Sequence, residues 1–334
     1  MENYKVTIRP RSSFITPLDS DTLFGSLCWI IRWKHGENKL EEFLDKYNNE
    51  PPFLISSGLQ ANCLPFPVTQ GISRSRLREI VKESYGDINP KTMNTVIRQI
   101  KKIKKEKYIP IDVFKDHINN FSLENLLLSI LGDNIDSMEE NYKKMFSHKK
   151  PFFTVKNRYH NMINRISNSS TDGELFTQRE ITYHDDIDIY LKLPKDDLFF
   201  WQNIFEALSY EGYGSKKSTG KGQFSIVDFK RVTLPKADNP SHFMTLSSFI
   251  PSDDIPKGNY KIKTKRGKLG SSFSQKKYSP WKKPVIFYEK GSTFELNAMT
   301  DNNNHGSLVN NIHHSLDNVV QYAYGFALEV KLDE

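Results

Sequence analysis

Cysteines and long apolar runs are scarce in this sequence of 334 residues. No stretch approaches the roughly 18 consecutive apolar residues that indicate a membrane-spanning helix. The two cysteines, Cys28 and Cys63, form no CxxC pair, which argues against a disulfide framework and a cysteine zinc site. Residues 1–10 alternate polar and apolar side chains and lack the apolar core of a signal peptide. We therefore expect a cytoplasmic protein without a membrane segment.

Acidic residues are absent from one long segment, residues 257–283, which we call the basic segment. It holds ten lysines and arginines, whereas the whole chain has 47 basic and 40 acidic residues and a net charge of +7. The rest of the chain is therefore slightly acidic. A local field of one sign indicates a polyanionic partner. A solvated loop is the alternative interpretation.

Periodicity predicts a mixed α+β protein of about two units. Strands are expected at residues 4–9, 187–193, 223–229, 261–265 and 285–288, with a long closing strand at 322–332. Helices are expected after a cap at Ser20 or Asp21, over residues 92–107, over residues 123–131 behind a Ser122 cap, and from 194–197 to 208–210. Residues 38–150 are otherwise mostly helical with short extended pieces, which predicts an insertion between more regular units.

Residues 151–183 predict a protruding β-hairpin. Two extended arms flank the polar tip SNSSTDGE, whose serine, asparagine, aspartate and glycine residues favour turns. The arms are long for a simple hairpin, so we expect it to stand away from the body.

A glycine-rich segment, GYGSKKSTGKG at 212–222, carries the strongest motif. Its glycines allow unusual backbone angles, and amides in such a loop form concavities that bind anions. It follows a helix and precedes a strand, whereas a P-loop and a dinucleotide fingerprint both need the reverse order. A plain αβ loop is the alternative. The residues expected to contact an anion are Gly212, Gly214, Ser215, Lys216, Lys217, Ser218, Gly220, Lys221 and Gly222.

This motif resembles the glycine-rich loop of the RAMP proteins of CRISPR systems. More narrowly, the chain is similar to the fourth Csm subunit of type III-A effector complexes. The matching pieces are SDTLFGSL (20–27), KKEKYIPI (104–111), the hairpin, YEGYGSKKSTGKGQF (210–224), KTKRGKLGSSF (263–273) and QYAYGFALEV (321–330). The sequence departs from the family's pattern at two positions of the loop. Ser215 stands where relatives often have glycine, and Lys217 stands where arginine is common. Lys217 lacks the bidentate fork of arginine.

The resemblance implies a fold of two ferredoxin-like (RRM-like) subdomains with a helical insertion and a hairpin thumb. We expect residues 1–150 to form the first subdomain with its insertion, completed by strands from later in the chain. Residues 151–185 are then the thumb, and residues 186–334 the second subdomain with the glycine-rich loop and the basic segment.

The resemblance also implies a non-catalytic subunit in antiviral defence that binds the 5′ repeat-derived tag of the CRISPR RNA (crRNA). Such subunits dock the large polymerase-like subunit that makes cyclic oligoadenylates, and they adjoin a backbone RAMP subunit. Their thumb contacts target RNA at the start of the guide. No cofactor is implied.

Further RNA contacts are expected from the hairpin and from the basic segment. Arg158, His160 and Arg165 would flank the tag or the first guide bases. Lys265 and Arg266 would hold phosphates, and Phe273, Tyr278 or Trp281 would stack on bases. Core packing is the alternative for each aromatic residue.

Other functions stay open at the level of sequence. Some RAMP proteins process precursor crRNA with a histidine as general acid–base, and His160, His184 or His35 could act in this way. The equivalent subunit of a Cmr-type (III-B) complex is a further alternative. A metal site is only weakly indicated, by His305, His313 and His314 or by Asp185, Asp186 and Asp188. We therefore expect no metal.

Overall fold

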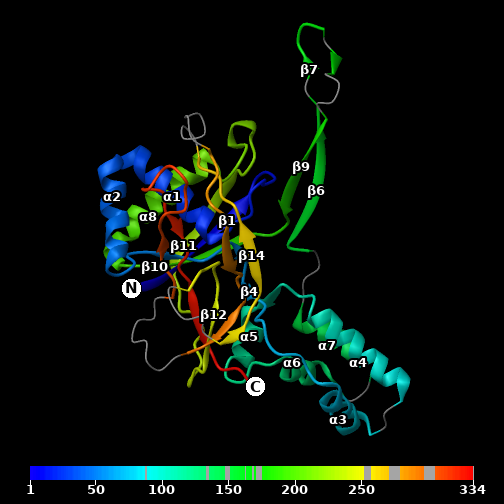
Figure 1. Cartoon of the computed structure of the whole chain (residues 1–334). Helices are drawn as coiled ribbons and strands as arrows, with labels where there is room; N and C mark the ends of the chain where they lie inside the picture. Colours follow the sequence, from blue (N-terminus) through cyan, green and yellow to red (C-terminus); the bar gives the residue numbers. More distant parts are fainter. Residues whose placement is uncertain are drawn as a thin grey trace.

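The computed structural model describes residues 1–86, 89–132, 135–146, 151–161, 163–167, 169–170, 175–251, 257–270, 279–296 and 305–333. Within these residues the fold is α+β, built on antiparallel sheets. A helical insertion lies at one end of the body, and a hairpin protrudes at the other (Figure 1). No helix among the described residues is long and apolar enough to cross a membrane.

The larger sheet has the order β11-β1-β10-β2, with β3 also paired to β10. Its strands are β1 (Glu2–Pro10), β2 (Leu54–Ile55), β3 (Leu59–Gln60), β10 (Ile187–Leu193) and β11 (Phe224–Arg231). Alternation explains β1, because Tyr4, Val6 and Ile8 are buried between less buried neighbours. The helices α1 (Ser20–His35) and α8 (Leu198–Glu211) complete a β–α–β–β–α–β arrangement.

This sheet combines residues that the sequence division had separated. Strands β10 and β11 come from the segment 186–334, yet they pair with β1 on its two sides. The predicted boundary at 185/186 therefore cuts through one sheet. The glycine-rich loop lies between α8 and β11, so it is next to the strand that pairs with β1.

A second sheet lies in the C-terminal part, with the order β13-β16-β12-β19. Its strands are β12 (His242–Thr245), β13 (Gly258–Asn259), β16 (Thr293–Glu295) and β19 (Ala327–Val330). Beside it, β14 (Ile262–Lys265) and β15 (Val285–Tyr288) pair as a ribbon. The sequence predicts strands at 261–265 and 285–288, and the structure shows that they pair with each other. Two further short strands, β17 (Leu308–Val309) and β18 (Gln321–Tyr322), pair with each other.

The closing strand is shorter than predicted. Alternation suggested one strand over residues 322–332, but the ladder is interrupted between β18 and β19. Residues 321–326 are buried without alternation. The ring of Tyr322 stacks on Phe24 of α1 at 4.4 Å, and the amide of Phe326 donates to the hydroxyl of Ser247. Contacts on both sides therefore replace a regular ladder here.

The helical insertion lies between β3 and β10. Its helices are α3 (Arg74–Tyr85), α4 (Pro90–Ile103), α5 (Ile111–His117), α6 (Leu123–Ile130) and α7 (Ser137–Met145), with β4 (Cys63–Pro65) paired to β5 (Tyr108–Pro110). The Ser122 cap is confirmed, since its hydroxyl accepts from the amide of Asn125. Helix α4 ends at Ile103, earlier than residue 107. The remaining helical pieces are α2 (Glu37–Asp45), η1 (Lys46–Asn48), η2 (Lys195–Asp197) and η3 (Lys217–Thr219).

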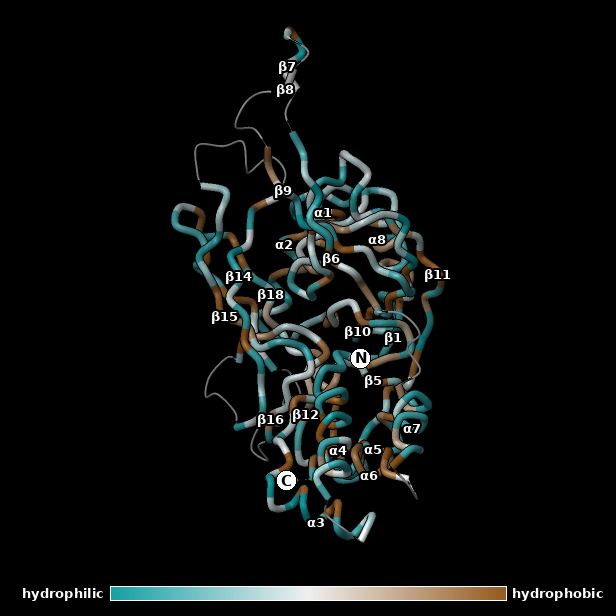
Figure 2. The backbone as a smooth tube through the Cα atoms, turned by 90° about the vertical axis from the view of Figure 1, so that its right-hand side faces the viewer, coloured by the Kyte–Doolittle hydropathy of each residue, from teal (hydrophilic) through white to brown (hydrophobic). Residues whose placement is uncertain are grey.

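The predicted hairpin is confirmed. Strand β6 (Phe153–His160) pairs with β9 (Phe176–Tyr183), and the small pair β7 (Ile163–Asn164) and β8 (Ser169–Ser170) lies beyond them. Two views at right angles show it standing away from the body (Figures 1 and 2). Phe14 anchors its base through backbone hydrogen bonds with Ile181.

Candidate nucleic-acid interface

The glycine-rich loop has a backbone that side chains would obstruct. Gly212, Gly214, Gly220 and Gly222 all have positive φ angles, and Lys216 is left-handed with φ of 63°. A Cβ on Gly222 would lie 1.9 Å from the carbonyl oxygen of Tyr213. The amide of Tyr213 donates to the Gly222 carbonyl at 2.9 Å, which closes the loop on itself. The glycines are therefore required by the fold of the loop.

Residues 12–16, which follow β1, hold this loop in place. The amide of Gly222 donates to the Ser13 carbonyl at 2.9 Å, and the amide of Ser215 donates to the Thr16 hydroxyl at 3.1 Å. These hydrogen bonds hold the loop in place at the start of β11, the edge strand of the larger sheet. Ser215, Lys216, Ser218 and Gly220 of the loop are exposed.

The three lysines of the loop differ in their partners. Lys217 pairs with Glu211 at 2.8 Å, and its ammonium lies 5.4 Å from the centre of the Trp33 ring. Lys221 pairs with Glu180 at 2.7 Å. Lys216 is exposed and makes no ion pair within the described residues. Lys216 is therefore the loop cation that has a free charge to offer an anion.

Glu180 on β9 connects the loop to the hairpin, and sequence reasoning missed it. Its side chain is only 2% exposed and accepts from Lys221, from the Ser13 hydroxyl and from Arg158 on β6 at 2.9 Å. Burial alone would raise the pKa of this carboxyl, but the bonds from Lys221 and Ser13 bring the pKa below its ordinary value. The usable signal was a single acid in an arm, LFTQREITY, that is otherwise neutral or basic.

The two other hairpin residues lie farther along it. The ring of His160 stacks on Phe176 at 5.4 Å, and its Nε2 is buried without a hydrogen bond to any described residue. Arg165 is exposed beyond β7. Of the predicted hairpin residues, the structure brings only Arg158 to the glycine-rich loop, through Glu180.

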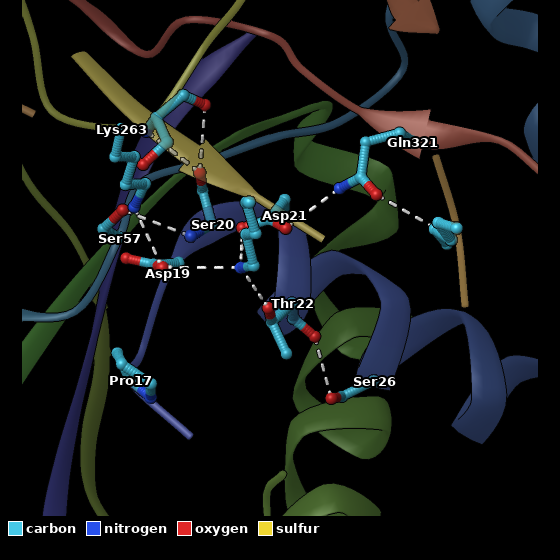
Figure 3. Close-up of polar contacts among 12 residues, drawn as sticks. Pro17, Asp19, Ser20, Asp21, Thr22, Ser26, Ser57, Lys263 and Gln321 are labelled. Carbon is cyan, nitrogen blue, oxygen red and sulfur yellow. Dashed lines mark hydrogen bonds and ion pairs between the residues drawn. The ribbon is translucent and has the colours of Figure 1, made fainter. Parts of the chain in front are cut away.

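The start of the basic segment is attached to the N-terminus of α1. Lys263 pairs with Asp19 at 2.9 Å (Figure 3). Lys265 donates to Asp21 and to the Thr22 hydroxyl, both at 2.7 Å. Burial would raise the pKa of Asp19, but Lys263 and Lys265 keep that pKa below its ordinary value. Lys265, predicted to hold a phosphate, is therefore engaged within the protein.

This network also corrects the predicted helix cap. The cap position of α1 is Asp19, whereas Ser20 and Asp21 are its first helical residues. Asp21 accepts from Gln321 Nε2 at 2.9 Å, and Ser20 donates its amide to the Ser57 hydroxyl at 3.1 Å (Figure 3). Tertiary contacts have replaced local capping at both residues.

Trp281 lies close to two cations of the basic segment. The guanidinium of Arg266 is 5.7 Å, and the ammonium of Lys268 5.8 Å, from its ring centre. The indole is 42% exposed, so a base could stack on it. Phe273 and Tyr278, the other predicted stacking residues, lie outside the described part of the chain.

Several residues considered for metal or acid–base chemistry are engaged with other groups. Asp186 pairs with Arg9 and Asp188 with Lys5, while His305 stacks on Phe243 at 3.7 Å. His313 and His184 are hydrogen-bonded to the Ser279 carbonyl and the Thr154 hydroxyl, and the ring of His35 lies 5.4 Å from Phe200. Among the described residues, no three histidines, cysteines or acids gather as a metal site.

Comparison with models of known protein families shows the family of this chain. A family model described as the RAMP superfamily matches residues 9–225, a span that runs from β1 through the hairpin and the glycine-rich loop to the start of β11. The chain belongs to the RAMP superfamily. A comparison of this RAMP chain with curated proteins finds no match.

Solved structures extend the likeness of this RAMP chain to its full length. A chain of a Csm1-Csm4 cassette in complex with cA4 is 15% identical, with a TM-score of 0.60 and 99% of each chain covered. A cassette with pppApA gives 16% identity, a TM-score of 0.57 and full coverage of both chains. A chain of a Csm3-Csm4 subcomplex in the type III-A CRISPR-Cas interference complex is 16% identical, with a TM-score of 0.57. The match covers 98% of this chain and 99% of that chain. At these identities the likeness concerns the fold.

Proposed function

We propose that this RAMP chain is a non-catalytic, crRNA-binding subunit of a type III-A (Csm) CRISPR interference complex. The observation that carries the proposal is the full-length fold likeness to chains from two assemblies, Csm1-Csm4 and Csm3-Csm4, which share Csm4. By this likeness the chain docks a large Csm1-type subunit and adjoins a Csm3-type backbone subunit. We further propose that the C-terminal sheet is the core of a second ferredoxin-like unit.

The glycine-rich loop fits the 5′ repeat-derived tag of the crRNA. Its backbone is fixed on residues 12–16, and the exposed Lys216 places a charge there that is available to a phosphate. Arg158 extends this surface onto the hairpin, which would meet target RNA at the start of the guide. Trp281 with Arg266 would stack on an unpaired base.

The experiment is affinity purification of the tagged full-length chain from cells that express the whole CRISPR locus. We expect guide RNA carrying the repeat-derived tag, together with a large polymerase-like subunit and a backbone RAMP subunit. Absence of tagged guide RNA would overturn the proposal, and Cmr-type companions would reassign the complex to III-B.

An endoribonuclease is the competing function, and it is favoured by the buried Nε2 of His160, which has no hydrogen bond to a described residue. Purified chain and repeat RNA, incubated without metal, separate the two functions. We expect intact RNA. Site-specific cleavage that His160→Ala abolishes, while His184→Ala does not, would replace the non-catalytic role.

A further inference from the structure

Two tryptophans on α1 lie between the glycine-rich loop and the basic segment. Trp29 and Trp33 are one helical turn apart, with ring centres 5.6 Å from each other. Lys217 of the loop has its ammonium 5.4 Å from the Trp33 ring. On the other side, a Cβ on Gly270 would lie 2.9 Å from the indole nitrogen of Trp29, so the backbone of the basic segment reaches this ring. The pair thus joins two segments with which the proposed function binds RNA.

Trp33 is exposed where an ordinary core aromatic would be covered. It is 49% exposed and, with Tyr210 of α8, lines an open pocket of about 370 Å³. The other lining residues are Ile30, Lys34, Ala207 and Glu211. This volume is at the low end for small-ligand sites and is of the order of one nucleotide. Apolar walls between two aromatic rings suit a flat base.

Cations surround the tryptophan pair. The guanidinium of Arg32 lies 5.5 Å from the Trp29 ring, and Lys34 lines the pocket beside Trp33. Glu37 and Glu211 pair with Arg32 and Lys217 and so hold those two cations near the rings. For a base stacked on Trp33, Lys34 is the pocket cation nearest at hand for its phosphate, because Glu211 already pairs with Lys217. Stacking beside a cation is the combination that single-strand binders use.

We infer that Trp33, with Tyr210 and Lys217, forms a base-stacking site for one nucleotide of single-stranded RNA that passes from the glycine-rich loop toward the basic segment. The inference rests on the proposed function and adds a site to it. A groove for a partner protein is the competing interpretation, but the two flanking segments that the proposed function assigns to RNA, and the cations near the rings, favour RNA.

Intrinsic fluorescence tests stacking directly, because a base on an indole quenches its emission. The chain has four tryptophans, of which Trp201 is buried. We would titrate the full-length chain with single-stranded oligoadenylate of about ten nucleotides, within the usual site sizes. We expect quenching that Trp33→Phe reduces, leaving the part that Trp281 contributes, while affinity stays within about twofold, since phenylalanine still stacks. Trp33→Leu should weaken binding about 5- to 150-fold, the range for one lost stack.

Phe199→Leu is the matched control. Phe199 is a 74% exposed aromatic on α8 that does not line the pocket, so its replacement should leave affinity and quenching unchanged. Wild-type affinity in Trp33→Leu, or full quenching in Trp33→Phe, would overturn the stacking site.

The same variants separate this site from the proposed function. If Trp33→Leu still recovers tagged guide RNA and binds oligoadenylate normally, the proposed function stands and the stacking site fails. If wild-type chain recovers no guide RNA, the proposed function fails, while Trp33-dependent quenching by oligoadenylate would still support the site. Loss of companion proteins at unchanged RNA affinity would assign the groove to protein and overturn the inference.

Discussion

Lys216 and Lys217 are neighbours in the glycine-rich loop, but their surroundings are different. Lys217 is held by Glu211 and the Trp33 ring, whereas Lys216 extends from a left-handed residue into solvent. A lysine that already has a carboxylate partner gives up part of that interaction when it meets a phosphate. The free energy of phosphate binding should therefore depend more on Lys216.

This difference can be tested with Lys216→Asn, because asparagine tolerates left-handed backbone better than most residues. We expect weaker binding to single-stranded RNA of any sequence, and a salt slope of log K against log salt that is shallower by about 0.7. Fluorescence anisotropy at several salt concentrations measures both.

Lys82→Asn, on the exposed face of α3 in the helical insertion, is the control and should leave the slope unchanged. An unaltered slope in Lys216→Asn would show that this lysine does not contact phosphate.

At the scale of elements, the loop between α8 and β11 is fixed by backbone geometry. Gly220 and Gly222 have similar positive φ angles of 76° and 71°. They differ in space, since a Cβ on Gly220 would meet no atom within 4 Å, whereas one on Gly222 would strike the Tyr213 carbonyl. Sequence alone could not separate these two glycines, because that carbonyl approaches only in the folded loop.

Gly222→Ala should therefore lower the free energy of unfolding far more than Gly220→Ala does. We expect the free energy of unfolding to fall by about 1–2 kcal/mol for Gly220→Ala, the cost of left-handed backbone, and by roughly 3 kcal/mol or more for Gly222→Ala, which adds a backbone collision. Urea denaturation measures both, and equal losses would contradict the close approach of Tyr213 to Gly222.

Across the whole molecule, the basic segment joins the C-terminal part to the N-terminal part. Lys265 reaches Asp21, Asp21 accepts from Gln321, and Lys282 donates to Gln321 Oε1 and the Val320 carbonyl. One hydrophobic cluster likewise runs from Tyr4 to Leu332. The two sheets therefore share a core, and a charge near their junction affects the stability of the whole chain.

Lys282 makes the free energy of unfolding depend on pH. Burial, more than nearby charges, lowers the pKa of Lys282 from 10.5 to about 8. Between these values the unfolded chain keeps a proton that the folded chain has lost, so this lysine makes the free energy of unfolding rise with pH from about 8 to 10.5. Below pH 8 both states are protonated and the contribution is constant.

We therefore expect wild type to gain stability relative to Lys282→Met between pH 7.5 and 9.5. Urea denaturation of both proteins at the two pH values gives the difference, in which tyrosine and cysteine titrations largely cancel. Lys283→Met, a half-buried neighbour, is the control. Parallel pH profiles for wild type and Lys282→Met would contradict the lowered pKa.

Local patterns allowed much of the fold to be predicted. Alternation located β1 and β10, a serine cap located α6, and turn residues between two extended arms located the hairpin. The glycines identified the loop, since its positive φ angles favour glycine and, at Gly222, a Cβ would strike the Tyr213 carbonyl. Each of these features depends on neighbours in the sequence, where side-chain shape and backbone preference act directly.

Only the tertiary structure decided which charges are free and which strands are neighbours. Lys265 is more than 240 residues from Asp21, its partner, so no spacing rule could reveal the pair. The same holds for Glu180 with Lys221, for the pairing of β1 with β10 and β11, and for the interruption before β19. By itself the sequence determined the basic segment and the glycine-rich loop, because both are local. Folding left Lys216 available while engaging Lys217, Lys221 and Lys265, because ion pairs follow distance in space.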